Sequence, residues 1–113
     1  MKYDLEERTI KYSEEIITLC RKVPKNTLSI PTIDQLIRSA TSIGANYTEA
    51  NGASSKKDFK NKINICKKEA METKYWLRLL AKTDEHFTEE CRSLWREAHE
   101  LTLIFSKITK SSQ

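Results

Sequence analysis

The sequence predicts an all-α fold, an antiparallel four-helix bundle with up-down-up-down connections. Apolar residues recur at alternating steps of three and four in four segments, which places one apolar stripe along one side of each helix. This average spacing of about 3.5 residues favours the shallow crossings of helix bundles. The chain has two glycines and two prolines among 113 residues, too few for the many turns of a β fold. A chain of this length is expected to form a single domain over residues 1–113.

Each predicted helix has its own apolar seam, and the four seams together form the predicted core. The first helix is expected over 4–23, with Leu5, Thr9, Tyr12, Ile16, Leu19 and Val23. The second is expected over 32–50, with Ile33, Leu36, Ala40, Ile43, Tyr47 and Ala50. The third is expected over 55–82, with Phe59, Ile63, Cys66, Ala70, Thr73, Leu77 and Leu80. The fourth is expected over 88–109, with Cys91, Leu94, Ala98, Leu101, Phe105 and Ile108.

Residues with strong end preferences support these boundaries. Ser55, with Asp58 three residues later, resembles a capping box at the start of the third helix. Pro31 suits the opening turn of the second helix, and Gly52 suits a left-handed stop after it. Thr88 is expected to cap the last helix with its side-chain oxygen.

A group of lysines forms the main candidate binding site. The whole chain has a formal net charge of +4, whereas the segment 56–68 alone has six lysines and one aspartate. A lysine-rich face at a helix start can bind phosphates of a nucleic acid backbone without reading its sequence. The candidate phosphate contacts are Lys56, Lys57, Lys60, Lys67 and Lys74.

An ordinary solvated helix face is the alternative interpretation of these lysines. Glu69 and Glu72 are expected on the same face further along the helix, where they would weaken its positive charge. In addition, no interleaving of arginine with aromatic residues is apparent that would favour base stacking.

The predicted second helix has an unusual polar face, formed by Gln35, Arg38, Ser42, Asn46 and Glu49. Gly44 lies nearby, and a glycine inside a helix costs about 1 kcal/mol relative to alanine. We therefore expect another backbone to approach closely at Gly44. The polar face is interpreted as a ladder against another helix or subunit, as a solvated face, or as a catalytic face.

Several large apolar residues lie outside the narrow seams, among them Trp76 and Trp95. If they are exposed together, they mark an interface, and self-association becomes an expectation. The cysteines Cys20, Cys66 and Cys91 are expected to be small buried residues.

No catalytic residue, metal or cofactor is predicted. His86 and His99 are thirteen residues apart, and no cysteine pair has metal-ligand spacing. Phosphate-cradling loops and nucleophile motifs are absent from the sequence. No apolar run is long enough to span a membrane, and the first residues lack a secretory signal, so we expect a cytoplasmic protein.

Three ordered segments resemble a known family. The first covers Gln35–Ala50 and reads QLIRSATSIGANYTEA. It resembles the second-helix signature, roughly QIRRAAxSIxxNIAEG, of the four-helix bundle proteins encoded in intervening sequences of bacterial ribosomal RNA. Residues 55–59 read SKKDF, similar to the family's SKKEF, and residues 72–80 read ETKYWLRLL, similar to its ETxYWLxLL. The family's ending Ala-Glu-Gly is replaced here, and Gly52 comes two residues late.

The resemblance implies properties that periodicity does not show. Members of this family form antiparallel bundles that assemble as five-fold rings, so a homopentamer is implied. Related accessory proteins of diversity-generating retroelements bind nucleic acid and a reverse transcriptase. No catalytic residue follows from the resemblance. Positions Arg38, Ser42, Asn46 and Glu49 match the family's polar positions and are interface or binding candidates.

The expected function is that of a non-enzymatic bundle that self-associates and binds the backbone of RNA or DNA, or acts as a scaffold. The alternative is a protein–protein adaptor without nucleic-acid binding, whose partner would contact the Trp76 and Trp95 surfaces. An enzyme would need a concave site with a perturbed acid or base, and the sequence offers no assembled candidate.

Overall fold

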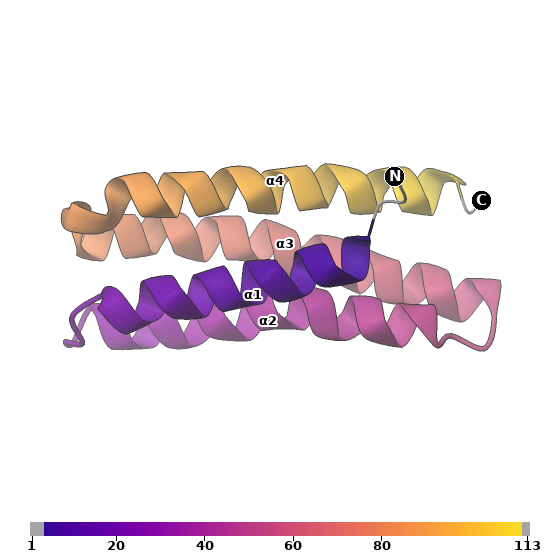
Figure 1. The fold of residues 1–113 in the computed structure, drawn as a ribbon, viewed down its shortest axis with the longest axis horizontal. Helices are drawn as coiled ribbons and strands as arrows, with labels where there is room; N and C mark the ends of the chain where they lie inside the picture. The colour runs from indigo at the N-terminus through magenta and orange to yellow at the C-terminus, as the bar shows by residue number, and fades with distance from the viewer. Residues whose placement is uncertain (1–3, 112–113) are drawn as a thin grey trace.

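The computed structural model describes residues 4–111, which form four antiparallel helices connected up-down-up-down (Figure 1). The helices are α1 (Leu5–Lys22), α2 (Ser29–Asn51), α3 (Lys56–Thr83) and α4 (Thr88–Ser111). A short 3-10 helix, η1 (Glu85–Phe87), precedes α4. Among the described residues there is no strand. The four-helix bundle predicted from the sequence is therefore confirmed.

The predicted seams meet along the bundle axis as one hydrophobic core. Burial of one apolar stripe per helix removes that surface from water, which is the main driving force for such a fold. The largest fully buried apolar side chains are Tyr12, Phe105, Ile16, Leu19, Leu36, Ile43, Ile63, Leu77, Leu80, Leu101 and Val23.

At the starts of α2 and α3, side-chain oxygens accept hydrogen bonds from backbone N–H groups. Ser55 caps α3 as predicted, because its Oγ accepts a hydrogen bond from the Asp58 backbone N–H at 3.0 Å. In contrast, α2 begins at Ser29, three residues before the expected start. Asn26 Oδ1 accepts the backbone N–H groups of Leu28 and Ser29, each at 2.9 Å, and this turn leads directly into the helix.

Two predicted end signals are wrong. Gly52 has a φ of −99° and is not left-handed. Its N–H instead bonds back to the Glu49 carbonyl at 3.1 Å, which closes α2 with a tight turn. Thr88 does not cap α4, since its φ of −54° and ψ of −47° are already helical. The cap lies earlier, where Asp84 Oδ1 accepts the His86 N–H at 3.1 Å at the start of η1.

The helices do not pack equally on one another. α2, α3 and α4 contact their sequence neighbours over most of their length, whereas α1 packs mainly on α2 and only sparsely on α4 (Figure 1). The close backbone approach expected at Gly44 is confirmed, because a Cβ there would lie 3.6 Å from the backbone carbonyl carbon of Thr9 in α1, and 3.1 Å from its Oγ1.

Candidate nucleic-acid interface

The predicted lysines begin at the first turn of α3 and continue along the side that faces α4. Lys56 and Lys57 are exposed, and Lys60, Lys67 and Lys74 are half-buried. The last three are spaced by seven residues, so they share one side of the helix. Lys74 shows that this side borders α4, because its ammonium lies between two α4 side chains.

Lys74 links the lysine side of α3 to the aromatic residues of α4. Its Nζ lies 3.2 Å from His99 Nδ1 and 5.1 Å from the centroid of the Trp95 ring. His99 in turn stacks on Trp95, with ring centroids 5.3 Å apart and planes 13° apart. A cation over an indole is an attractive contact, so Lys74, Trp95 and His99 form one packed cluster across the α3–α4 seam.

The prediction that Glu69 and Glu72 share the lysine face is wrong. Both carboxylates turn toward α2, where the Arg38 guanidinium donates to Glu72 and, at 3.3 Å, to Glu69. Trp76 Nε1 also donates to Glu72 Oε2, at 2.8 Å. The two glutamates follow Lys67 by two and five residues, which rotates them by about 200° and 140° around the helix. The lysine side therefore keeps its positive charge.

The polar face of α2 contacts α3 of the same chain or its own helix. Arg38 also donates through Nε to Gln35 Oε1 at 3.0 Å. Glu49 Oε1 accepts from Lys62 Nζ on α3 at 2.8 Å. Asn46 Nδ2 donates to the half-buried Ser42 carbonyl at 2.8 Å. These contacts support a ladder between α2 and α3, and a role at a subunit interface stays a prediction.

The two tryptophans are half-buried, so they do not form one exposed surface. Trp76 packs edge-on against Tyr75, with ring centroids 4.9 Å apart. The exposed large apolar residues are spread over all four helices and the α1–α2 connection. They are Ile10, Ile17, Leu28, Ile30, Ile65, Met71, Tyr75, Leu79 and Leu103.

A pocket of about 500 Å³ lies between α3 and α4 and contains residues that sequence reasoning missed. Three arginines with exposed side chains surround it, Arg78 from α3 and Arg92 and Arg96 from α4. The remaining lining residues are Leu77, Ala81, Thr88, Cys91 and Trp95. The expectation that arginine and aromatic residues do not interleave is thus wrong for this seam.

Part of this pocket could have been found in the sequence. Trp95 and Arg96 follow Arg92 by three and four residues, so both lie next to Arg92 on the surface of α4. No local signal places Arg78 beside them, because it belongs to a different helix. Packing of α3 against α4 is what completes the group.

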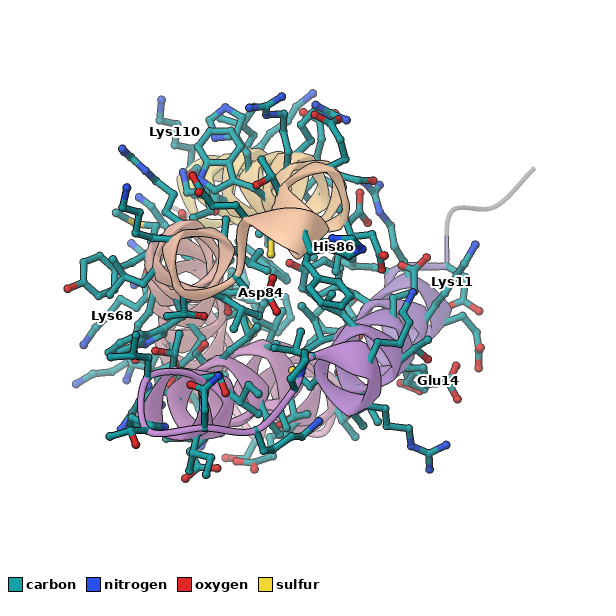
Figure 2. All side chains as sticks on the ribbon, turned by 90° about the vertical axis from the view of Figure 1, so that its left-hand side faces the viewer. Lys11, Glu14, Lys68, Asp84, His86 and Lys110 are labelled. Atoms are coloured by element: carbon teal, nitrogen blue, oxygen red, sulfur yellow. The ribbon has the colours of Figure 1, made fainter. Side chains whose placement is uncertain are left out.

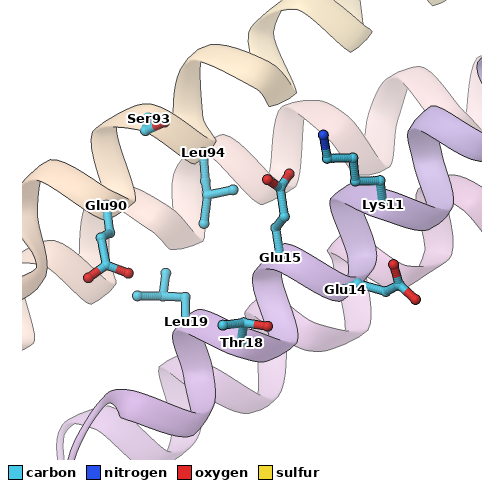
Figure 3. A pocket seen from close by; sticks show the side chains of 8 residues that line it. All are labelled: Lys11, Glu14, Glu15, Thr18, Leu19, Glu90, Ser93 and Leu94. Atoms are coloured by element: carbon cyan, nitrogen blue, oxygen red, sulfur yellow. The ribbon is translucent and has the colours of Figure 1, made fainter.

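The other side of α4 faces α1 across a groove with a different charge. Figure 3 shows Glu15 of α1 pointing into the space between the two helices, with Leu19 and Leu94 across from one another. This groove encloses a pocket of about 340 Å³ lined by Lys11, Glu14, Glu15, Thr18, Leu19, Glu90, Ser93 and Leu94. Three of these residues are acidic and one is basic. A second pocket in the same groove adds Arg8, Arg96, Glu97 and Glu100. The groove as a whole therefore has more acidic than basic residues, which disfavours a polyanion, although Arg96 borders it as well.

The cysteines are buried, as predicted. Burial raises the pKa of Cys20 and Cys91 to about 11 and that of Cys66 to about 12. Their thiols are therefore protonated near neutral pH and are poor nucleophiles. Within residues 4–111, no three His, Cys, Asp or Glu side chains are grouped so that they could hold a metal ion.

These observations define an all-α helix bundle with one basic seam. The chain belongs to the family of 23S rRNA-intervening sequence proteins, whose sequence model matches residues 1–107. This confirms the resemblance seen in the sequence. No protein of curated function matches the chain.

A solved structure from Bacteroides thetaiotaomicron supports the same assignment. It is described as a protein with unknown function from the S23 ribosomal protein family, determined at 1.70 Å resolution. The two chains are 34% identical, the match covers 95% of this chain and 99% of the other, and the TM-score is 0.86. Separately, none of the helices within residues 4–111 is both long and apolar enough to cross a bilayer.

Proposed function

We propose that this protein is a non-enzymatic, self-associating bundle that binds the sugar–phosphate backbone of RNA or DNA along the α3–α4 seam. One observation carries the proposal: Lys74, the last of the aligned lysines, contacts Trp95 of the arginine-rimmed pocket, while Glu69 and Glu72 are turned to α2. Figure 2 shows side-chain nitrogens gathered on the outer side of α3 and α4. The proposed contacts are Lys56, Lys57, Lys60, Lys67 and Lys74, together with Arg78, Arg92 and Arg96.

This arrangement suits a backbone ligand. Lysine and arginine side chains neutralise phosphates and release condensed counterions, so binding weakens steeply as salt rises. Contacts to phosphates position a nucleic acid without reading its bases. A cytoplasmic location is part of the proposal, because it brings the protein together with RNA.

Self-association strengthens such a surface. Ile10 and Ile17 lie seven residues apart on one side of α1 and are about 40% exposed, which favours a contact with a second copy. The family resemblance implies a ring of five. Several copies of a weak basic seam on one assembly would bind a long polyanion together, with much higher avidity than one copy.

The test measures the affinity of a fluorescent RNA at several salt concentrations. A Lys56→Glu/Lys60→Glu variant is expected to bind at least about tenfold more weakly and to reduce the salt slope by about two. The matched control is Lys11→Glu/Arg21→Glu on α1, which changes the net charge equally but lies away from the seam, and it should bind like the unmodified protein.

Two outcomes would overturn the proposal. Absence of RNA and DNA binding at about 50 mM salt would remove it, and so would equal losses in the two charge-reversed variants. In either case a protein–protein adaptor becomes the better hypothesis. Sedimentation of the purified protein tests the second half, since a monomer at all concentrations would contradict self-association.

A further inference from the structure

The pocket between α3 and α4 has the size and lining of a small-molecule site. Its volume of about 500 Å³ lies within the range of about 300–1,000 Å³ typical of ligand pockets. Leu77 is fully buried, Cys91 is nearly so, and Ala81 and Trp95 are half-buried. The lining is therefore apolar and aromatic where it is deepest, with charge confined to the rim.

The arginines at the rim of the pocket are positively charged and are poorly neutralised by acidic side chains. Arg78 and Arg96 have no ion-pair partner within the described part of the chain, residues 4–111. Arg92 pairs with Glu89 at 2.8 Å, but both side chains are more than half exposed, so water screens this contact strongly. A guanidinium fork matches the geometry of phosphate oxygens. An anionic ligand with an apolar, flat body would complement both parts of the pocket.

Trp95 is fixed by two neighbouring side chains and also lines the pocket. His99 stacks on it one turn further along α4, and Lys74 lies over its ring. The pocket lies toward Thr88 and Cys91, on the N-terminal side of Trp95. A ring that is fixed in this way provides a preformed platform, and stacking of a base on such a platform tolerates any sequence.

We propose that this pocket receives one unstacked nucleotide of a single-stranded RNA or DNA, with its phosphate at Arg78 and Arg96 and its base against Ala81 and Trp95. The proposal rests on the function proposed above and adds a preference for single strands. A base within a duplex is paired and stacked, so it cannot enter. Charge alone would give the opposite preference, because a duplex has the higher charge density.

The first experiment fills the pocket without changing its charge. Ala81→Phe is expected to weaken binding of a fluorescent single-stranded 12-mer by about tenfold, in line with the loss of one stacked base. The same variant should bind a 12-base-pair duplex as the unmodified protein does. Circular dichroism and the thermal midpoint check that the variant is folded, and Ala81→Leu serves the same purpose should the phenylalanine disturb the helix.

The second experiment separates the pocket arginines from general charge. Arg78→Ala/Arg96→Ala should weaken single-strand binding at least about tenfold more than the matched control Lys68→Ala/Lys82→Ala. Both controls are exposed residues of α3, and Figure 2 shows Lys68 on the side of α3 away from α4. A Trp76→Phe protein retains Trp95 as its single tryptophan, and its fluorescence should change on addition of the single strand but not of the duplex.

The outcomes distinguish the two proposals. Equal binding of single strand and duplex, with Ala81→Phe and Ala81→Leu without effect, would overturn the pocket assignment and leave backbone binding intact. No binding of either nucleic acid would overturn both. Single-strand preference that disappears in the filled pocket would support both.

Discussion

Helix α4 has two long neighbours, and its seams with α3 and α1 are built differently. α3 is joined to α4 by a short connection, and the two helices contact along most of their length. α1 reaches α4 from the far end of the sequence and contacts it sparsely. Arg8 of α1 bonds to Glu97 through two hydrogen bonds of 2.6 and 2.8 Å, and Tyr12 Oη donates to the Leu94 carbonyl at 2.8 Å.

The difference shows how a bundle closes. A short connection makes α3 and α4 neighbours, so nondirectional apolar burial is enough to hold them together. No connection brings α1 to α4, and directional polar contacts complete that seam. The charges follow the same division in their balance. The charged residues of the α3–α4 pocket are all basic, whereas acidic residues outnumber basic ones along the α1–α4 groove. We therefore expect a polyanion at one seam of α4 and not at the other.

Removing a fully buried side chain of α3 should have the largest effect. Leu80→Ala is expected to lower the free energy of unfolding by about 2–5 kcal/mol, because it leaves a cavity in the core. The matched change Leu94→Ala, at a half-buried position of the α1–α4 groove, should cost less than half as much. Urea unfolding measures both, and equal losses would contradict the distinction between the two seams.

Alkaline pH is expected to destabilise the bundle through its buried thiols. The folded pKa values of about 11 to 12 lie above the usual 9.0. The stability that burial of the neutral thiols provides is therefore complete below pH 9 and is lost as pH rises toward 11–12. Each buried thiol should lower the free energy of unfolding at pH 10.5 by about 2 kcal/mol relative to pH 8.

Single cysteine replacements sharpen this pH prediction. Cys66 has the highest pKa of the three, and its Sγ lies 3.5 Å from the Ile43 carbonyl between α2 and α3. Cys66→Ala and Cys20→Ala should each remove about 2 kcal/mol of the alkaline decline at pH 10.5, because both folded pKa values lie above that pH. A stability that is constant between pH 8 and 10.5 would be incompatible with this account.

The next prediction concerns how α1 is positioned. In Gly44→Ala the new methyl group would lie 3.1 Å from Thr9 Oγ1 and 3.3 Å from Thr9 Cβ. Relief of the glycine penalty gains about 1 kcal/mol, whereas overpacking costs about 1–3 kcal/mol. We expect a net loss of about 1 kcal/mol, and a smaller loss in a Thr9→Ala background. A stabilising Gly44→Ala would show that α1 can shift on α2.

The smallest expected effect comes from removing one hydrogen bond between α1 and α4. Tyr12→Phe removes the hydrogen bond to the Leu94 carbonyl and should lower the free energy of unfolding by about 1 kcal/mol. Tyr75→Phe is the control, since Tyr75 is exposed and its loss should be near zero. A Tyr12→Phe protein as stable as the control would mean that apolar packing alone closes the bundle.

The candidate site was only partly accessible to sequence reasoning. The lysines follow from composition and spacing, and Arg38 and Glu49 follow from helical periodicity. Glu69 and Glu72 were misplaced, because their side of α3 depends on where α2 packs. Arg78 joins Arg96 and Trp95 only through the contact between two helices. Gly52 and Thr88 were misassigned because both residue types are compatible with more than one kind of helix end.

The spacing of apolar residues by itself determined the number of helices, their inward faces and the core, because burial of a stripe depends only on helical period. Side-chain oxygen at Ser55 likewise determined where α3 begins. The tertiary structure alone decided which charges share a surface and which residues line the pocket. Those properties depend on how helices from distant parts of the chain are rotated against one another, and no local pattern in the sequence contains that rotation.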